Sequence, residues 1–163
     1  MRLGMFVRLL SLSLLGCATE AEPQAVGATT LEIEIGIPDK DTRSMFLPLS
    51  PGGEIYFFKG LQVEEFVMLA VRSRQTEPEA FVEVTVENED KGTRTTRPPW
   101  KDPEPFDCTD DGLCALVPLL LPARELGELT ELDGARLNVQ CAVWLEDGTR
   151  GEARIEGVLR PQR

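Results

Sequence analysis

Short segments in which apolar and polar residues alternate recur along this chain, and they limit its fold more than any other feature. Residues 31–37 read Leu-Glu-Ile-Glu-Ile-Gly-Ile, and residues 79–87 place Val82, Val84 and Val86 on one parity with polar residues between them. Successive side chains of a β-strand point to opposite faces, so this pattern predicts strands with one buried face. The sequence therefore predicts an all-β protein.

Further strands are predicted between turn signals rich in Gly, Pro, Asp and Asn. Residues 65–74 are apolar on both parities, which is typical of a central strand covered on both faces. Pro118 interrupts the apolar run 114–121, which favours an edge strand or a bulge. Residues 122–134 are predicted to hold a single helical turn. The remaining predicted strands are residues 45–47, 54–58, 93–97, 136–145 and 152–159.

The last two predicted strands form a hairpin around an Asp-Gly-Thr segment, and their parity restricts the loop length. A two-residue loop would set Val143 opposite the charged Glu152. An odd loop instead sets Val143 opposite Ala153 and Cys141 opposite Ile155, which keeps apolar residues on one face. We therefore predict a connection of three or five residues with a bulge.

Seven to nine short strands with turn signals every 8 to 12 residues predict a two-sheet sandwich over residues 31–163. A small β-barrel is the alternative. Leu132-Asp133-Gly134, followed by a strand, an Asp-Gly turn and another strand, resembles the last hairpin of immunoglobulin-like domains. The resemblance covers about 30 residues, and it implies an immunoglobulin-like sandwich.

The N-terminus has the layout of a secretory signal. Arg2 and Arg8 give a positive start, residues 9–15 are apolar, and the small Gly16 precedes Cys17. The apolar run is shorter than the roughly 20 residues that a membrane-spanning helix needs. Residues 1–16 are therefore predicted to be a signal peptide.

Leu14-Leu15-Gly16-Cys17 resembles the lipobox of bacterial lipoproteins. The resemblance implies that the signal is removed, that the thiol of Cys17 carries a fatty acyl chain, and that this lipid holds the protein at a membrane. Ala18, where an Asp would favour retention, resembles the pattern sent to the outer membrane. Residues 17–30 are small and polar, which predicts a flexible tether. We expect an outer-membrane lipoprotein, facing either the periplasm or the cell surface.

Composition excludes several functions. Histidine is absent, which removes histidine-dependent catalytic triads and histidine-ligated metal sites. The formal net charge of −11 would repel nucleic-acid phosphates. No phosphate loop, dinucleotide fingerprint or nucleophile elbow is present, so we expect no cofactor and no enzymatic activity. A small histidine-independent hydrolase remains the minor alternative.

Three cysteines remain if Cys17 is lipidated, and exported proteins keep disulfides. Cys108 and Cys114 flank a short Asp- and Gly-containing turn that can bring them together, so this pair is the predicted disulfide. The rival pairing is Cys114 with Cys141. Cys141 lies on the apolar parity of its strand and is predicted to be a buried thiol.

The same turn contains Asp107, Asp110 and Asp111, a weak calcium candidate. An EF-hand loop needs oxygen ligands at its positions 1, 3, 5 and 12. Here Thr109 stands at position 3 and Pro118 at position 12. A turn stabilised by its own Asp and Gly residues is the favoured interpretation, and no metal is expected.

A non-catalytic interaction or adhesion module is the predicted function, with an accessory subunit of an envelope complex as the alternative. Trp100 and Phe106 lie in a stiff proline-rich segment, and Trp144 lies on the polar parity of its strand. These aromatic side chains are candidate contacts for an unknown protein or glycan partner. Packing back onto the sandwich is the favoured alternative for all three.

Overall fold

The computed structural model describes residues 30–59, 64–75 and 77–162. The predicted signal peptide, Cys17 and residues 17–29 of the tether lie outside the described residues. In the described part the chain is all-β, with two short 3-10 turns, η1 (Ala123–Leu126) and η2 (Leu129–Glu131). No helix in that part is long and apolar enough to cross a bilayer. The strands are β1 (Ile33–Pro38), β2 (Phe46–Pro48), β3 (Gly53–Lys59), β4 (Glu65–Arg74), β5 (Glu79–Asn88), β6 (Thr93–Arg97), β7 (Glu104–Pro105), β8 (Asp107–Cys108), β9 (Leu113–Pro122), β10 (Arg136–Trp144) and β11 (Arg150–Pro161).

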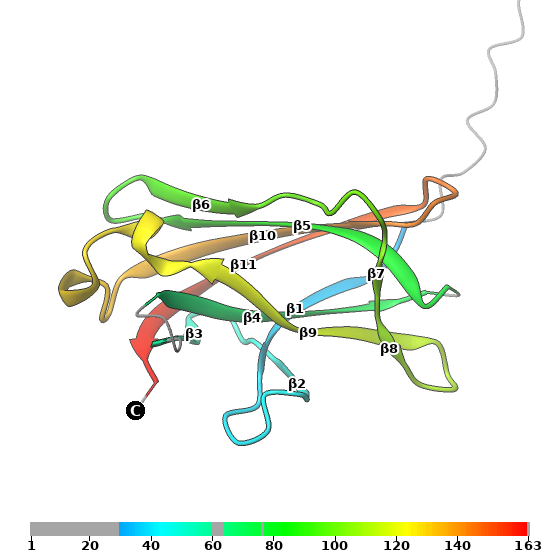
Figure 1. Ribbon diagram of the computed structural model, residues 1–163, viewed down its shortest axis with the longest axis horizontal. Helices are drawn as coiled ribbons and strands as arrows, with labels where there is room; N and C mark the ends of the chain where they lie inside the picture. The colour runs from blue at the N-terminus through cyan, green and yellow to red at the C-terminus, as the bar shows by residue number, and fades with distance from the viewer. Residues whose placement is uncertain (1–29, 60–63, 76, 163) are drawn as a thin grey trace, which may run out of the picture.

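The strands form two packed layers (Figure 1). One layer has the order β6-β5-β10-β11, and in the other β4 pairs with β9 on one side and with both β1 and β3 on the other. The predicted class, an all-β sandwich, is confirmed, and the sheet is open rather than closed into the alternative barrel. The described part contains eleven strands, more than the predicted seven to nine, because the two-residue strands β7 and β8 are absent from the predicted set.

Strand β11 joins the two layers at one side. It pairs antiparallel with β10 along most of its length and parallel with β3 over its last five residues. Gly157 takes part in both pairings, and a Cβ there would lie 2.6 Å from Ile55 Cδ1 and 3.0 Å from the carbonyl oxygen of Gly53. Glycine therefore permits the close approach through which β11 passes from one layer to the other.

Alternating positions of both layers form the core. The predicted parity of β5 is confirmed, because Val82, Val84 and Val86 are fully buried. They pack with inward side chains of the same cluster from the other strands. The outward side of β4 is also covered, since Met68 and Ala70 are buried there, as its unbroken apolar sequence predicted. The main inward partners are Ile55, Val67, Leu69, Val71, Leu119, Leu121, Leu137, Val139 and Val143.

Strand β9 carries the irregularity predicted at Pro118. Leu69 of β4 faces Leu119, but Val71 faces Leu116, so β9 contains one more residue than β4 across this step. The proline lies in that extra stretch, where a missing N–H costs no ladder hydrogen bond.

The C-terminal hairpin confirms the predicted odd loop but corrects its register. Five residues, 145–149, separate β10 from β11. Leu145 N–H donates to the carbonyl oxygen of Thr149, so the turn inside this hydrogen bond has three residues, 146–148. Cys141 therefore faces Ala153, two residues away from the predicted Ile155. Gly148 has φ +86°, the left-handed conformation that a bulged three-residue turn requires. Apolar residues remain on one face, so the parity rule holds while the register differs.

Candidate functional site

A bidentate ion pair fixes both ends of the proline-rich loop between β6 and β7. Arg97 Nη1 donates to Glu104 Oε1 at 2.7 Å, and Nη2 donates to Oε2 at 2.5 Å. The side chains of Arg97 and Glu104 are only 17% and 14% exposed. A planar guanidinium matched to a carboxylate specifies one geometry. Residues 98–103, here called the Trp100 loop, therefore begin and end at fixed points.

Trp100 projects from this loop into solvent. Its side chain is 65% exposed, the highest exposure of any large hydrophobic residue in the described part of the chain. Pro98, Pro99 and Pro103 restrict the backbone on both sides of it. The guanidinium carbon of Arg97 lies 5.9 Å from the Trp100 ring centroid. The loop thus holds an aromatic side chain outward instead of folding it over the sheet, and the favoured prediction for Trp100 is wrong.

Phe106 has the opposite placement. It is 5% exposed, belongs to the core cluster, and donates its N–H to the carbonyl oxygen of Pro78 at 2.7 Å. Phe106 is therefore unavailable to a partner, which corrects its inclusion among the candidate contacts. The two aromatic residues that the sequence placed in one segment have separate roles, one in the core and one in solvent.

Trp144 lies on the outer surface of the layer formed by β6, β5, β10 and β11. It faces Phe81 on β5 and Arg150 on β11 across the two ladders. The Phe81 and Trp144 rings stack with centroids 5.8 Å apart, and the guanidinium carbon of Arg150 lies 5.4 Å from the Trp144 ring on the other side. The indole is thus engaged by side chains of both neighbouring strands. Phe81 and Arg150 could not be identified from sequence, because their proximity follows from strand pairing.

A hollow of about 430 Å³ lies on the same outer surface, next to this stack. Ala142 on β10 is part of its lining, with Glu83 on β5 opposite it on one side and Glu152 on β11 opposite it on the other. The alanine side chain is much smaller than its neighbours along the strand, so the surface is depressed there. The side chains of the outer face that line this hollow, here called the β10 hollow, are Glu83, Thr85, Gln140, Ala142, Arg150, Glu152 and Arg154.

Several polar groups of the β10 hollow are only partly used by the protein. Arg150 Nη2 lies 2.8 Å from Glu152 Oε1, and Arg154 Nε donates to Asn138 Oδ1 at 2.8 Å. Within the described residues, the side chains of Glu83 and Gln140 have no hydrogen-bond or ion-pair partner. A carboxylate acceptor and an amide that both donates and accepts are therefore available to a ligand.

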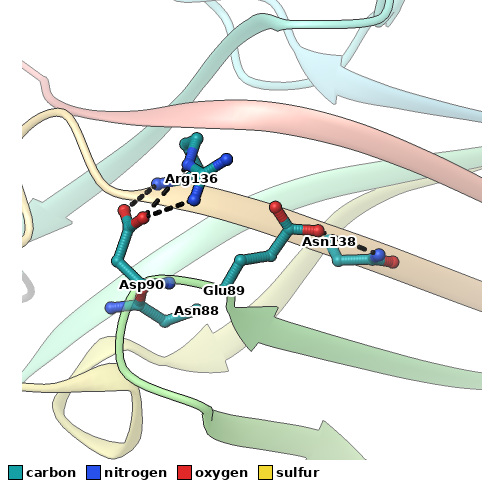
Figure 2. Close-up of polar contacts among 5 residues, drawn as sticks. All are labelled: Asn88, Glu89, Asp90, Arg136 and Asn138. Carbon is teal, nitrogen blue, oxygen red and sulfur yellow. Dashed lines mark hydrogen bonds and ion pairs between the residues drawn. The ribbon is translucent and has the colours of Figure 1, made fainter.

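At the end of this outer face away from the β10 hollow, polar side chains bind one another (Figure 2). Asp90 accepts from the backbone N–H of Arg136 at 3.0 Å and from its guanidinium at 2.9 and 3.0 Å. These donors, the backbone N–H first, lower the pKa of the Asp90 carboxyl. Asn138 Nδ2 donates to Glu89 at 3.4 Å. The polar groups at this end are paired with one another, whereas the side chains of Glu83 and Gln140 in the β10 hollow are not.

The predicted disulfide between Cys108 and Cys114 is present and joins β8 to β9 at the end of their hairpin. Cys141 is a free thiol, buried in the core, so the rival pairing with Cys114 does not form. Burial raises the pKa of the Cys141 thiol to about 12, and the positive charge of Arg97 acts weakly in the opposite direction. The thiol is therefore protonated and unreactive at neutral pH.

Of the three aspartates in the acidic turn, Asp111 forms a side-chain hydrogen bond within the turn itself. Asp111 accepts a hydrogen bond from the hydroxyl of Thr109, which lowers the pKa of the Asp111 carboxyl. Asp107 lies on β8 opposite Ala115, and Asp110 lies at the tip of the hairpin. In the residues that the structure covers, no three acidic or cysteine side chains come together in a way that could hold a metal ion.

Comparison with known proteins adds no relative. No protein-family model matches the chain, and no curated protein matches it either. The conclusions about function therefore depend on the residues and geometry described above.

Proposed function

We propose that the chain is a lipid-anchored, non-catalytic interaction module of a bacterial cell envelope, with Trp100 at the centre of its contact surface. The lipobox-like segment ending at Cys17 supports the anchor, and Ala18 supports placement at the outer membrane. Residues 17–30 are long enough to hold the sandwich up to roughly 45 Å from the lipid. The module would then reach partners near the membrane while remaining attached to it.

The exposure of Trp100 carries this proposal. Full burial of a large apolar side chain contributes roughly 1.5–3 kcal/mol, and this contribution is lost while Trp100 stays in water. The Arg97–Glu104 pair and three prolines hold the side chain in one region of space, which reduces the entropy lost on binding. Tryptophan is enriched at the energetic centres of interfaces. A rigidly presented tryptophan is thus suited to anchor a partner.

The lowered pKa values of four carboxyl groups have causes that fit a structural role for these groups. Each lowered carboxyl pKa has its main cause in a hydrogen bond from a backbone N–H or a hydroxyl group to a carboxylate that lies in a turn or loop. Perturbed values at a catalytic site instead arise from burial and like-charge pairs in a cleft. The carboxyl groups concerned are those of Asp39, Asp90, Asp111 and Asp147.

Site-specific photocrosslinking in cells tests the proposal. Benzoylphenylalanine replaces Trp100 in one variant and the exposed Arg124 of η1 in a control variant. We expect a light-dependent adduct at position 100, seen as a discrete larger species or as protein retained on envelope material, and none at position 124. Absence of an adduct at position 100, or equal yields at both positions, would contradict the proposed contact.

A further inference from the structure

We infer that the β10 hollow binds a neutral glycan, so that the partner of this module is a polysaccharide rather than a protein. The inference rests on the proposed function, because it names the chemical class of the partner that the module binds. It concerns a different set of side chains from Trp100, which lie on the outer face of β5, β10 and β11. These three strands lie side by side in one layer (Figure 1).

The charges of the hollow cancel. Glu83 and Glu152 contribute two negative charges, and Arg150 and Arg154 contribute two positive charges around the same depression. The protein as a whole has a formal net charge of −11. A polyanion would be repelled by the molecule and a polycation would meet two arginines at the hollow. The local balance therefore favours a ligand without net charge.

The hydrogen-bonding groups suit hydroxyls. A sugar hydroxyl donates one hydrogen bond and accepts others, so it needs acceptors and donors side by side. Glu83 supplies an acceptor, the Gln140 amide supplies both kinds of group, and the guanidinium of Arg154 supplies donors. These three side chains come from three adjacent strands. The β5–β10 and β10–β11 registers fix their positions relative to one another. Rigid strands hold such groups better than loops do.

The shape fits a short stretch of a chain polymer. The small apolar Ala142 forms the floor and the stacked Trp144 stands beside it on the same face of β10. The Trp100 loop runs along the free edge of β5, because β6 ends opposite Val84 and β7 resumes opposite Ala80. The loop thus passes beside Phe81 and Glu83, at the rim of the hollow. A glycan that occupies the hollow can continue over this edge toward Trp100.

Affinity electrophoresis of the full chain in mild detergent tests the inference. Native gels contain a cellulose ether, a laminarin-type glucan or glycol chitin as neutral probes, and dextran sulfate as an anionic probe. We expect retardation by at least one neutral probe. Glu83→Gln removes the charged acceptor and Ala142→Leu fills the hollow, and each is expected to weaken binding about tenfold or more. Glu87→Gln, on the same face of β5 but outside the hollow, serves as the matched control and should bind like the wild type.

Three results of the electrophoresis would overturn the inference. Retardation by no neutral probe, retardation by dextran sulfate alone, or equal retardation of wild type and both hollow variants would each do so, provided that thermal melts show folded protein. A light-dependent adduct at position 100 without retardation by any neutral probe would leave the interaction module in place with a partner of another class. Retardation without that adduct would keep the glycan site and remove the proposed role of Trp100.

Discussion

At the scale of single residues, the position of the Cys141 thiol determines its reactivity. Burial among core side chains raises its pKa to about 12, so the reactive thiolate is nearly absent at about pH 8. We predict that iodoacetamide leaves Cys141 unmodified in the native protein and alkylates it in denaturant, as measured by peptide mass spectrometry. Rapid modification of the native protein would show that the thiol is accessible.

Asp39 determines the conformation of the loop between β1 and β2. Its carboxylate accepts from the Thr42 hydroxyl at 2.6 Å, from Thr42 N–H at 2.7 Å and from Met45 N–H at 2.8 Å. These hydrogen bonds, that of the Thr42 hydroxyl first, hold the pKa of the Asp39 carboxyl well below its usual range. The stabilisation is therefore present above the unfolded pKa of about 3.9 and is lost as the pH falls toward the lower folded value.

We predict that the amides of Thr42 and Met45 lose protection from hydrogen exchange as the pH falls below about 4, after correction for intrinsic exchange rates. Asp39→Asn should lower their protection already at neutral pH and abolish the acid dependence. Equal protection in wild type and variant would show that the carboxylate does not hold the loop.

Glu104 stabilises the base of the Trp100 loop through Arg97. Glu104→Ala leaves a mostly buried guanidinium without its partner, and we predict a loss of about 2–3 kcal/mol, below the ~3–5 kcal/mol of fully buried pairs because both side chains keep some exposure. The measurement is denaturant unfolding. Arg97→Met combined with Glu104→Leu should recover most of this loss, and a double variant no more stable than Glu104→Ala would contradict the assignment.

At the scale of elements, Gly151 allows the beginning of β11 to lie close to Leu31 and Ile33. A Cβ at this position would lie 2.3 Å from the carbonyl oxygen of Leu31 and 2.7 Å from Ile33 Cγ1. Backbone cannot move aside cheaply, so we predict that Gly151→Ala costs about 1–3 kcal/mol in chemical denaturation. Glu152→Ala, one residue on and exposed, should change stability by no more than about 0.5 kcal/mol. Equal stability of the two variants would contradict the predicted clash.

Strands with a local signal were predictable from the sequence. The bounds of β4 and β6 agree with the expected residues 65–74 and 93–97, because turn residues flank both segments. The odd loop of the last hairpin followed from parity alone. Its register did not, because a three-residue turn and a five-residue turn keep the same parity and differ by two residues in pairing. That choice depends on the local turn conformation at Gly148.

At the scale of the whole molecule, the candidate site was only partly predictable. Trp100 stood out as an aromatic residue in a proline-rich segment, but its exposure depends on the ion pair between Arg97 and Glu104. The opposite charges of Arg97 and Glu104, seven residues apart, were a sequence signal for this ion pair. The β10 hollow carried no local signal, since Glu83, Ala142 and Glu152 meet only through pairing of strands far apart in the sequence.

The most direct test of the account combines the anchor with the contact surface. Photocrosslinking from position 100 is measured in membrane and soluble fractions, with Cys17 intact and with Cys17→Ser. The account predicts that the intact protein is in the membrane fraction and forms the adduct, whereas the Cys17→Ser protein is released and its adduct yield falls. Membrane attachment that persists in Cys17→Ser, or intact protein at the membrane without an adduct at position 100, would contradict it.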